Sequence, residues 1–283
     1  MPNCSVSSAR RFPPKDRHLR KAPNRMSSTK SISAAQPVNA WVDAVYVLSV
    51  KGSDFRIRHI ESELARKGIA FSFMFEHDAV ELTDEMLGAT FGPSSMKRAH
   101  KSLVLKNIQV WKDSVARGYQ RVLVFEDDAV LCDDFIAGFD TAMQAAVKLP
   151  PGWLVFLGGL DTKVPDSYFL APGPLVELPI PTAEGCVHDR LAMERRLTWL
   201  ENNKVVLSVD HLMSHIDAAM GSHQYWLRQP IVEQGSVTGI FDSLLDAGRQ
   251  KHSRTFNVLR NRWNKFRRRR LREWLVKFKA LVH

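Results

Sequence analysis

The sequence predicts an α/β fold in which a mostly parallel sheet is flanked by helices. Short continuous apolar runs of strand length alternate along the chain with segments whose apolar residues recur at helical spacing. The chain has 283 residues, 45% of them hydrophobic, which is enough to bury a core of its own. We expect a single domain whose ligand crevice lies outside the carboxyl ends of the strands.

The first alternation lies between residues 44 and 75. Residues 44–48 are a continuous apolar run that predicts a buried strand, ending at Ser49. Apolar residues then recur at helical spacing up to Gly68, a natural helix C-cap, and they are Ile57, Ile60 and Leu64. Residues 69–75 read as a second strand, so this stretch predicts a βαβ unit.

A second helix and two further strands follow. The next helix face stops at Gly118 and consists of Val104, Ile108, Trp111 and Val115. Residues 121–125 form an apolar run that leads directly into three consecutive acids, Glu126-Asp127-Asp128. Residues 153–157 repeat the pattern of an apolar strand before a flexible loop, and the Pro-rich stretch 160–181 predicts a long loop beside the ligand crevice.

The net charge of +10 is concentrated at the two ends of the chain. Residues 1–38 carry +7 and residues 260–283 carry +9, which leaves −6 on residues 39–259. We expect a disordered basic tail over 1–38, a folded domain over 39–250 and a basic amphipathic helix over 251–283.

The C-terminal segment carries apolar side chains on one helical face, namely Leu271, Trp274, Leu275 and Phe278. Lys and Arg fill the rest of the segment, a pattern that suits the interface of an anionic membrane. The alternative is a helix docked on the protein's own core through Trp274 and Phe278. Nucleic acid is not an expected partner, since no nucleic-acid-binding motif accompanies the charge.

Cysteine usage and hydropathy predict a compartment. The three cysteines are far apart and include no CxxC pair, which favours a reduced, cytoplasmic environment. The sequence has neither the apolar segment of a signal peptide nor a run of about 18 apolar residues. We therefore expect peripheral contact with the inner face of the membrane.

The three consecutive acids carry the chemistry. Like charges crowded at a strand end repel one another, and a divalent cation resolves that conflict, so Mn²⁺ or Mg²⁺ is the expected cofactor. Glu126 and Asp128 alternate along the strand and should face one side, with Asp127 on the other. We assign Asp128 to the metal and Glu126 to the metal or a donor ribose. A solvated acidic turn or a helix N-cap cluster is the alternative.

The acidic stretch resembles a known family. Residues 120–130, Gln-Arg-Val-Leu-Val-Phe-Glu-Asp-Asp-Ala-Val, resemble the "RVLVLEDDV" signature of glycosyltransferase family 25, the lipooligosaccharide-type sugar transferases. Other stretches agree with that family in the same order, namely residues 45–50 with Arg56 and Arg58, His77-Asp78-Ala79, Trp111, residues 154–159, residues 208–212 and residues 229–236. The resemblance covers residues 42 to 243.

The resemblance implies a GT-A type, Rossmann-like fold and a metal-dependent, inverting hexosyl transfer. The donor would be a nucleotide-diphospho sugar, typically UDP-galactose, and the acceptor a glycan or lipid-linked sugar, as in lipooligosaccharide, lipopolysaccharide or cell-surface glycan assembly. Donor contacts would come from Ser49, Arg56, Asn107, Glu126 and Asp127.

Two residues of the resembling "PVDxxL" stretch are further candidates. Inversion in one displacement requires a base near the acceptor hydroxyl, and Asp210 is the candidate. Its alternative role is the N-cap of a helix at Leu212. His211 is a candidate metal ligand, with a partly buried structural histidine as the alternative.

The sequence departs from the family in the helix before the acidic strand. Lys106-Asn107 stands where the family has a Ser-His pair. Asn107 can still donate and accept hydrogen bonds, and Lys106 is expected to pair with phosphate.

Two other classes of function are compatible with parts of the pattern. A non-catalytic protein would bind membrane or nucleic acid through the basic tails and keep the α/β domain as a scaffold. A receiver-like or phosphohydrolase domain would need a phosphoacceptor such as Asp161 after the next strand, and the 160–181 loop does not fit that pattern.

Overall fold

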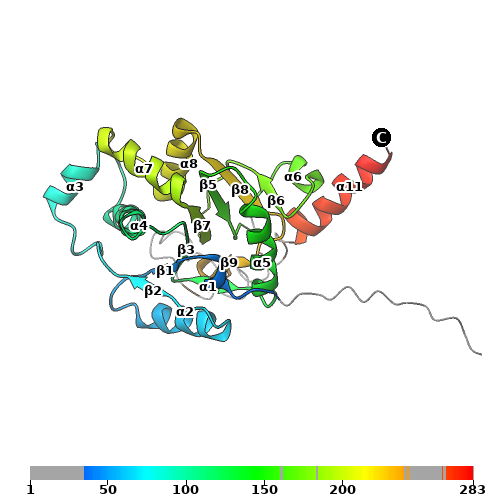
Figure 1. Ribbon diagram of the computed structural model, residues 1–283, viewed down its shortest axis with the longest axis horizontal. Coiled ribbons are helices and arrows are strands. Elements are labelled where there is room, and N and C mark those ends of the chain that lie inside the picture. Colours follow the sequence, from blue (N-terminus) through cyan, green and yellow to red (C-terminus); the bar gives the residue numbers. More distant parts are fainter. Residues whose placement is uncertain are drawn as a thin grey trace, which may run out of the picture. The chain divides into compact units, whose positions relative to one another are not determined.

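A seven-stranded mixed sheet forms the middle of the computed structural model, in the order β2-β1-β3-β7-β5-β8-β6 (Figure 1). The model describes residues 35–159, 162–182, 184–238, 241, 263 and 266–282. The strands are β1 (Ala44–Leu48), β2 (Ser72–Met74), β3 (Arg121–Glu126), β5 (Trp153–Phe156), β6 (Leu175–Glu177), β7 (Gly185–Asp189) and β8 (His223–Leu227). All but β7 and β6 run in one direction, which confirms the prediction of a mostly parallel sheet.

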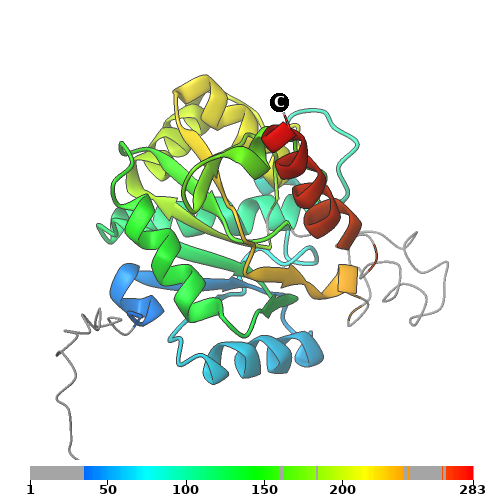
Figure 2. The same ribbon diagram turned by 90° about the vertical axis from the view of Figure 1, so that its right-hand side faces the viewer.

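Helices cover both faces of this sheet. One face packs against α1 (Val38–Trp41), α2 (Asp54–Arg66) and α5 (Phe135–Ala146). The other packs against α4 (Arg98–Ala116), α7 (Arg190–Asn202) and α8 (Val209–Met220). Figures 1 and 2 show the resulting three layers.

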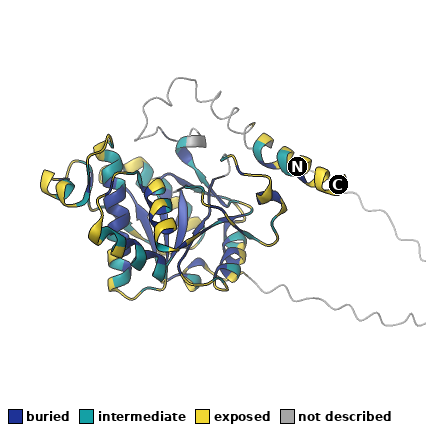
Figure 3. Cartoon of the chain, turned by 90° about the horizontal axis from the view of Figure 1, so that it is seen from above, coloured by how far each residue is buried: buried dark blue, intermediate teal, exposed yellow. Residues whose placement is uncertain are grey.

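The central strands read as unbroken apolar runs because both of their faces are buried. In β1, Val45 and Val47 belong to one core, whereas Tyr46 and Leu48 belong to the other. Alternate side chains of a strand point to opposite faces, so a strand covered by helices on both sides needs apolar residues throughout. Figure 3 shows these strands as the buried interior of the molecule.

Several short elements lie outside the main sheet. They are α3 (Asp84–Thr90), α6 (Ser167–Leu170), α9 (Gly235–Thr238) and the two-stranded sheet of β4 (Ala129–Leu131) with β9 (Val232–Gln234). The C-terminal elements are the π-helix η2 (Phe266–Leu271) and α11 (Arg272–Val282). None of the helices in the described residues is long and apolar enough to cross a membrane.

The sequence-predicted elements agree with this architecture in part. The strands at 44–48, 121–125 and 153–157 and the helices that end before Gly68 and Gly118 are confirmed. The predicted second strand is shorter than expected, and the predicted 160–181 loop contains α6 and β6. Strand β7, which runs antiparallel between β3 and β5, has no counterpart among the predicted elements.

The predicted tails lie largely outside the described residues. Residues 1–34 are not described. Residues 35–38 belong to the folded unit, since Val38 is buried and the backbone N of Gln36 donates a hydrogen bond to Asp140 Oδ1. The folded unit therefore starts a few residues before the predicted boundary. In the C-terminal segment, residues 266–282 are helical as predicted.

Candidate active site

The candidate site lies at the carboxyl ends of β1 and β3. These strands pair in parallel with Leu48 opposite Glu126, so the residues that follow each strand emerge side by side. The buried Ser49 hydroxyl donates a hydrogen bond to Asp127 Oδ2 at 2.8 Å. Parallel register thus joins two residues that are far apart in the sequence.

Arg56 brings a positive charge among the acids from the first turn of α2. Its Nη1 donates to Asp127 Oδ1 at 2.7 Å and lies 3.9 Å from Asp128 Oδ2. The guanidinium also stands over the Phe241 ring, 5.3 Å from the ring centre. The sequence pattern predicted a metal as the compensating charge, whereas the structure shows that Arg56 supplies part of it.

The predicted alternation of the acids is wrong beyond Glu126. Strand β3 ends at that residue, and Asp127 and Asp128 form a turn before β4. Strand alternation does not extend into a turn, and both aspartates lie within 4 Å of Arg56. All three acids line the same cavity.

Strand β9 brings residues 234–236 next to the turn formed by Asp127 and Asp128. Gly235 N donates to the Asp128 carbonyl at 2.7 Å, Ser236 N to Asp128 Oδ2 at 3.3 Å, and Gln234 Nε2 to Glu126 Oε2 at 3.4 Å. A Cβ on Gly235 would stand 2.8 Å from the Asp128 carbonyl oxygen, so this approach requires glycine. Gln234 and Ser236 were part of the sequence resemblance but were not assigned to the site.

Negative charge exceeds positive charge in this corner. Burial, followed by Asp128, Glu184, Asp127 and Asp210, raises the pKa of Glu126 well above its usual range. Burial also raises the pKa of Asp128, although Arg56 opposes the shift. Asp128 is 2% exposed, and its Oδ1 has no hydrogen-bond partner among the described residues. Such an atom is costly to bury unless a ligand completes it.

The pKa of Glu126 also points to a carboxylate that no sequence motif indicated. Glu184 precedes β7 and is buried, and its backbone carbonyl accepts a hydrogen bond from Glu126 N at 3.4 Å. A Cβ on Gly158 would lie 2.8 Å from Glu184 Oε2, so the glycine after β5 makes room for this side chain.

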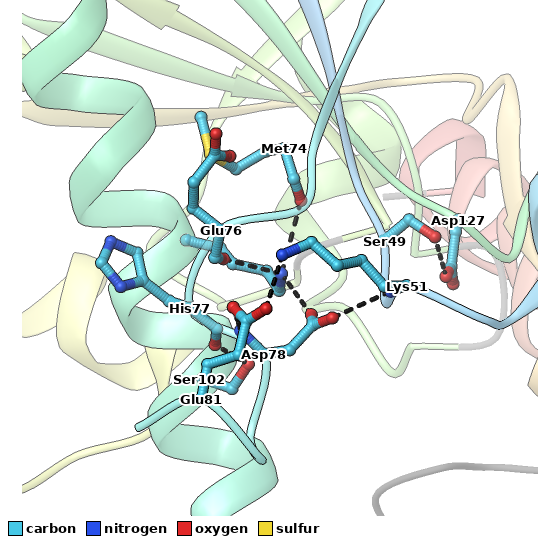
Figure 4. Close-up of polar contacts among 10 residues, drawn as sticks. Ser49, Lys51, Met74, Glu76, His77, Asp78, Glu81, Ser102 and Asp127 are labelled. Carbon is cyan, nitrogen blue, oxygen red and sulfur yellow. Dashed lines mark hydrogen bonds and ion pairs between the residues drawn. The ribbon is translucent and has the colours of Figure 1, made fainter. Parts of the chain in front are cut away.

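A second polar cluster connects the loop after β2 to α4, and its residues Asp78 and Lys106 line the same cavity (Figure 4). Lys106 of α4 is buried, and its ammonium donates to Asp78 Oδ1 at 2.7 Å, to the Glu76 carbonyl at 2.8 Å and to the Met74 carbonyl at 3.4 Å. The three donors of the ammonium are therefore used within the protein. Lys106 was expected to pair with phosphate, but its ammonium instead bonds the loop after β2 to α4.

These two clusters border one cavity of about 180 Å³. Its walls come from the ends of β1 and β3, from α2, from the loop after β2, from α4 and from the residues around the end of β9. Small-molecule sites usually measure about 300–1,000 Å³, so a whole nucleotide sugar would extend beyond this cavity.

The remaining predicted residues are not among those that line the cavity. Asn107 is buried and donates to the Leu103 carbonyl within α4 at 2.9 Å. Asp210 lies in the first turn of α8, where it accepts a hydrogen bond from Ser208 Oγ at 3.0 Å. The helix begins at Val209, so the alternative role of Asp210 as an N-cap is wrong. His211 is exposed, so its alternative role as a partly buried histidine is also wrong.

The carboxylates of Glu126 and Asp128 suit a metal ion that takes only some of its ligands from the protein. Within the described residues, no group of three or more His, Cys, Asp or Glu is arranged to hold a metal alone. Mg²⁺ and similar ions commonly take one or two carboxylates together with substrate phosphates. Asp128 Oδ1, which has no hydrogen-bond partner among the described residues, fits that open kind of site together with Glu126 beside it.

Comparisons of the sequence with protein families and with curated proteins find no relative of this chain. No protein-family model matches the sequence, so the resemblance to glycosyltransferase family 25 rests on its motifs alone. No curated protein matches it at a significant level.

Two solved structures are similar to this chain at low identity. The apo form of mouse xyloside xylosyltransferase 1 is 12% identical, with a TM-score of 0.38 over 65% of this chain and 84% of its own. A glycosyltransferase involved in the glycosylation of the major capsid of PBCV-1 is 9% identical, with a TM-score of 0.39 over 78% of this chain and 99% of its own. Similarity at this level does not identify an activity, which has to come from the residues of the site.

Proposed function

We propose that this chain is a metal-dependent glycosyltransferase of the GT-A type that uses a nucleotide-diphospho sugar. One observation carries the proposal: Arg56 and three acids, one with a buried oxygen that lacks a partner among the described residues, meet at the carboxyl ends of two parallel strands. Ligands of α/β proteins bind at such strand ends. A surplus of buried carboxylates there favours a cation, and Arg56 favours an anion.

Arg56 would bind the diphosphate of the donor. A guanidinium presents a planar fork of donors that matches phosphate oxygens, and Asp127 holds this one in place through a 2.7 Å contact. Ser49 in turn fixes Asp127 through its hydroxyl. The chain thereby orients the positive group before the donor arrives, which reduces the cost of ordering it.

Asp128 and Glu126 would hold a divalent ion, Mn²⁺ or Mg²⁺, which when bound stabilises the negative charge of the departing nucleoside diphosphate. Their raised pKa values fit this role, since burial and the neighbouring carboxylates oppose the charged form and a bound cation would favour it.

Asp210 is proposed as the base. It would take the proton of the acceptor hydroxyl as that oxygen bonds to the anomeric carbon and the nucleoside diphosphate leaves with the bonding electron pair. Asp210 is partly exposed in the first turn of α8, and its charge is felt at Glu126. The finer assignment, galactose from UDP-galactose to a glycan or lipid-linked acceptor with inversion, rests on the motif resemblance.

Replacing Asp128 tests the proposal. D128N keeps the side-chain shape but removes the charge, and we expect Mn²⁺-dependent UDP release from UDP-galactose to fall by about 100- to 1,000-fold. The matched control is D133N, the same change at a fully exposed aspartate, which should leave the rate unchanged. A D128N enzyme with the wild-type rate would remove Asp128 from the site.

Binding of the donor gives a second measurement that does not need an acceptor. UDP-galactose with Mn²⁺ should raise the thermal unfolding midpoint of the wild type, because a ligand stabilises the state that binds it. D128N should lose most of this shift. The proposal would be contradicted if UDP-galactose raised the unfolding midpoints of both proteins equally. It would also be contradicted if no nucleotide sugar raised the midpoint of the wild type.

A further inference from the structure

Helix α11 has one face turned to the protein and one turned to solvent. On the inner side Val276 is 8% exposed and packs into the core that includes Tyr168 and Phe169 of α6. Figure 1 shows α11 beside α6, and Figure 3 shows how little of α11 is buried. The helix is therefore attached to the domain along a single narrow strip.

Two arginines fix this attachment. The buried Arg269 guanidinium lies over the rings of Tyr168 and Trp226, 4.9 and 5.9 Å from their centres, and donates to the Gly159 carbonyl. Arg272 pairs with Asp166 at 2.7 Å. Cation–π and ionic contacts together set which side of α11 faces outward.

The outward face is apolar. Its side chains are 37 to 85% exposed, and they are Leu271, Trp274, Leu275, Phe278, Leu281 and Val282. At 3.6 residues per turn they fall within an arc of about 120°. The Trp274 and Phe278 rings stack on each other with centres 5.6 Å apart. The alternative that these two rings dock on the protein's own core is thereby wrong.

Basic residues border this apolar face. Lys277 and Lys279 fall on its two sides by helical geometry, and Arg267 and Arg270 are exposed in the preceding turn. Glu273, which pairs with Lys277, is the one acid in residues 266–282. An apolar strip with cationic borders is complementary to a lipid surface of negative charge.

We infer that α11 lies in the headgroup layer of an anionic membrane, with Trp274 and Phe278 inserted among the lipids. A symmetric contact with a second copy would bring the same basic borders together, which is unfavourable. Nucleic acid would use the charges but would leave the exposed apolar side chains in water. This inference does not depend on the proposed activity.

Vesicle binding by the full chain tests the inference. Co-sedimentation would compare phosphatidylcholine vesicles with vesicles that also contain phosphatidylglycerol. We expect strong binding only to the anionic vesicles, weakened by salt. W274S/F278S should bind more than about ten-fold more weakly. The matched control V147S/V206S changes two half-exposed valines elsewhere and should bind as the wild type does.

A charge variant keeps the test independent of the aromatic pair. K277Q/K279Q should weaken anionic-vesicle binding about ten-fold, since each basic residue near the surface contributes up to about five-fold. K112Q/K148Q, the same change at two exposed lysines outside α11, should have little effect.

Four results would overturn the inference. They are unchanged vesicle binding by W274S/F278S, unchanged binding by K277Q/K279Q, equal wild-type binding to neutral vesicles, and a wild-type dimer in sedimentation that W274S/F278S dissociates. Duplex DNA or RNA that displaces the protein from vesicles, with W274S/F278S binding the duplex normally, would assign the charges to nucleic acid instead.

Discussion

Two regions of this molecule bury charged side chains in opposite ways. On the face of the sheet that α7 and α8 cover, Arg196 of α7 donates to both oxygens of Asp217 at 2.8 and 2.6 Å and to His188 Nδ1 at 2.8 Å. Gln224 adds a further bond to Asp217 at 2.8 Å. Burial and Arg196 hold the pKa of His188 well below its usual range, so its ring stays neutral and accepts that bond. Positive and negative charges balance there.

At the candidate site, around Glu126, Asp127 and Asp128, positive and negative charges do not balance. Asp127 and Asp128 share the guanidinium of Arg56, Glu126 lies beside them, and one Asp128 oxygen has no partner within the described part of the chain. Buried networks that are fully satisfied rigidify a fold, whereas an unsatisfied one marks a place where something else binds. The contrast in charge balance distinguishes the structural cluster around Arg196 from the proposed functional cluster of Glu126, Asp127 and Asp128.

The largest effect is expected from breaking the balanced network. R196M leaves the Asp217 carboxylate buried without its partner and should lower the free energy of unfolding by about 3–5 kcal/mol. Urea unfolding measures this change. The double variant R196M/D217L removes both charges and should recover part of the loss. A double variant less stable than R196M would mean that the ion pair is not what the single substitution breaks.

An intermediate effect is expected at the Lys106–Asp78 pair, which is balanced but borders the cavity. K106M should cost about 2–3 kcal/mol, less than R196M, because Asp78 lines the cavity, where water can reach its carboxylate, and keeps the hydrogen bond from Lys51 N at 2.9 Å. K106M/D78N is the control and should be closer to the wild type in urea unfolding. If K106M instead keeps its stability and loses nucleotide affinity, Lys106 belongs with the functional cluster.

The smallest effect is expected at Glu126, and its sign is opposite. A carboxyl group whose pKa is raised in the folded state binds protons more tightly there than in the unfolded chain, so stability falls as pH rises from about 4.5 through the raised pKa. E126Q removes this penalty. Its thermal unfolding midpoint should match the wild type at pH 4 and exceed it by about 2–4 °C at pH 8. A midpoint gap that is the same at both pH values would show that charge is not the cause.

The sequence by itself determined the alternation of strands and helices and the position of the acidic turn. The runs at 44–48 and 121–125 are local signals, because a strand buried on both faces needs apolar residues at every position. The three acids follow the second run directly, so their place at the edge of the sheet could be predicted from their neighbours.

Only the tertiary structure decided which residues neutralise, complete or surround those acids. Arg56 and Ser236 lie 72 and 108 positions from Asp128, and β7, with Glu184 before it, inserts beside β3 from more than 50 residues further along. Local periodicity predicts that a residue is buried but does not predict which residues it contacts. Pairing of charges depends on strand register and on which helices cover each face of the sheet. For the same reason the sequence left open whether Trp274 faces outward or docks on the core, and it did not predict that the Lys106 ammonium is buried against Asp78.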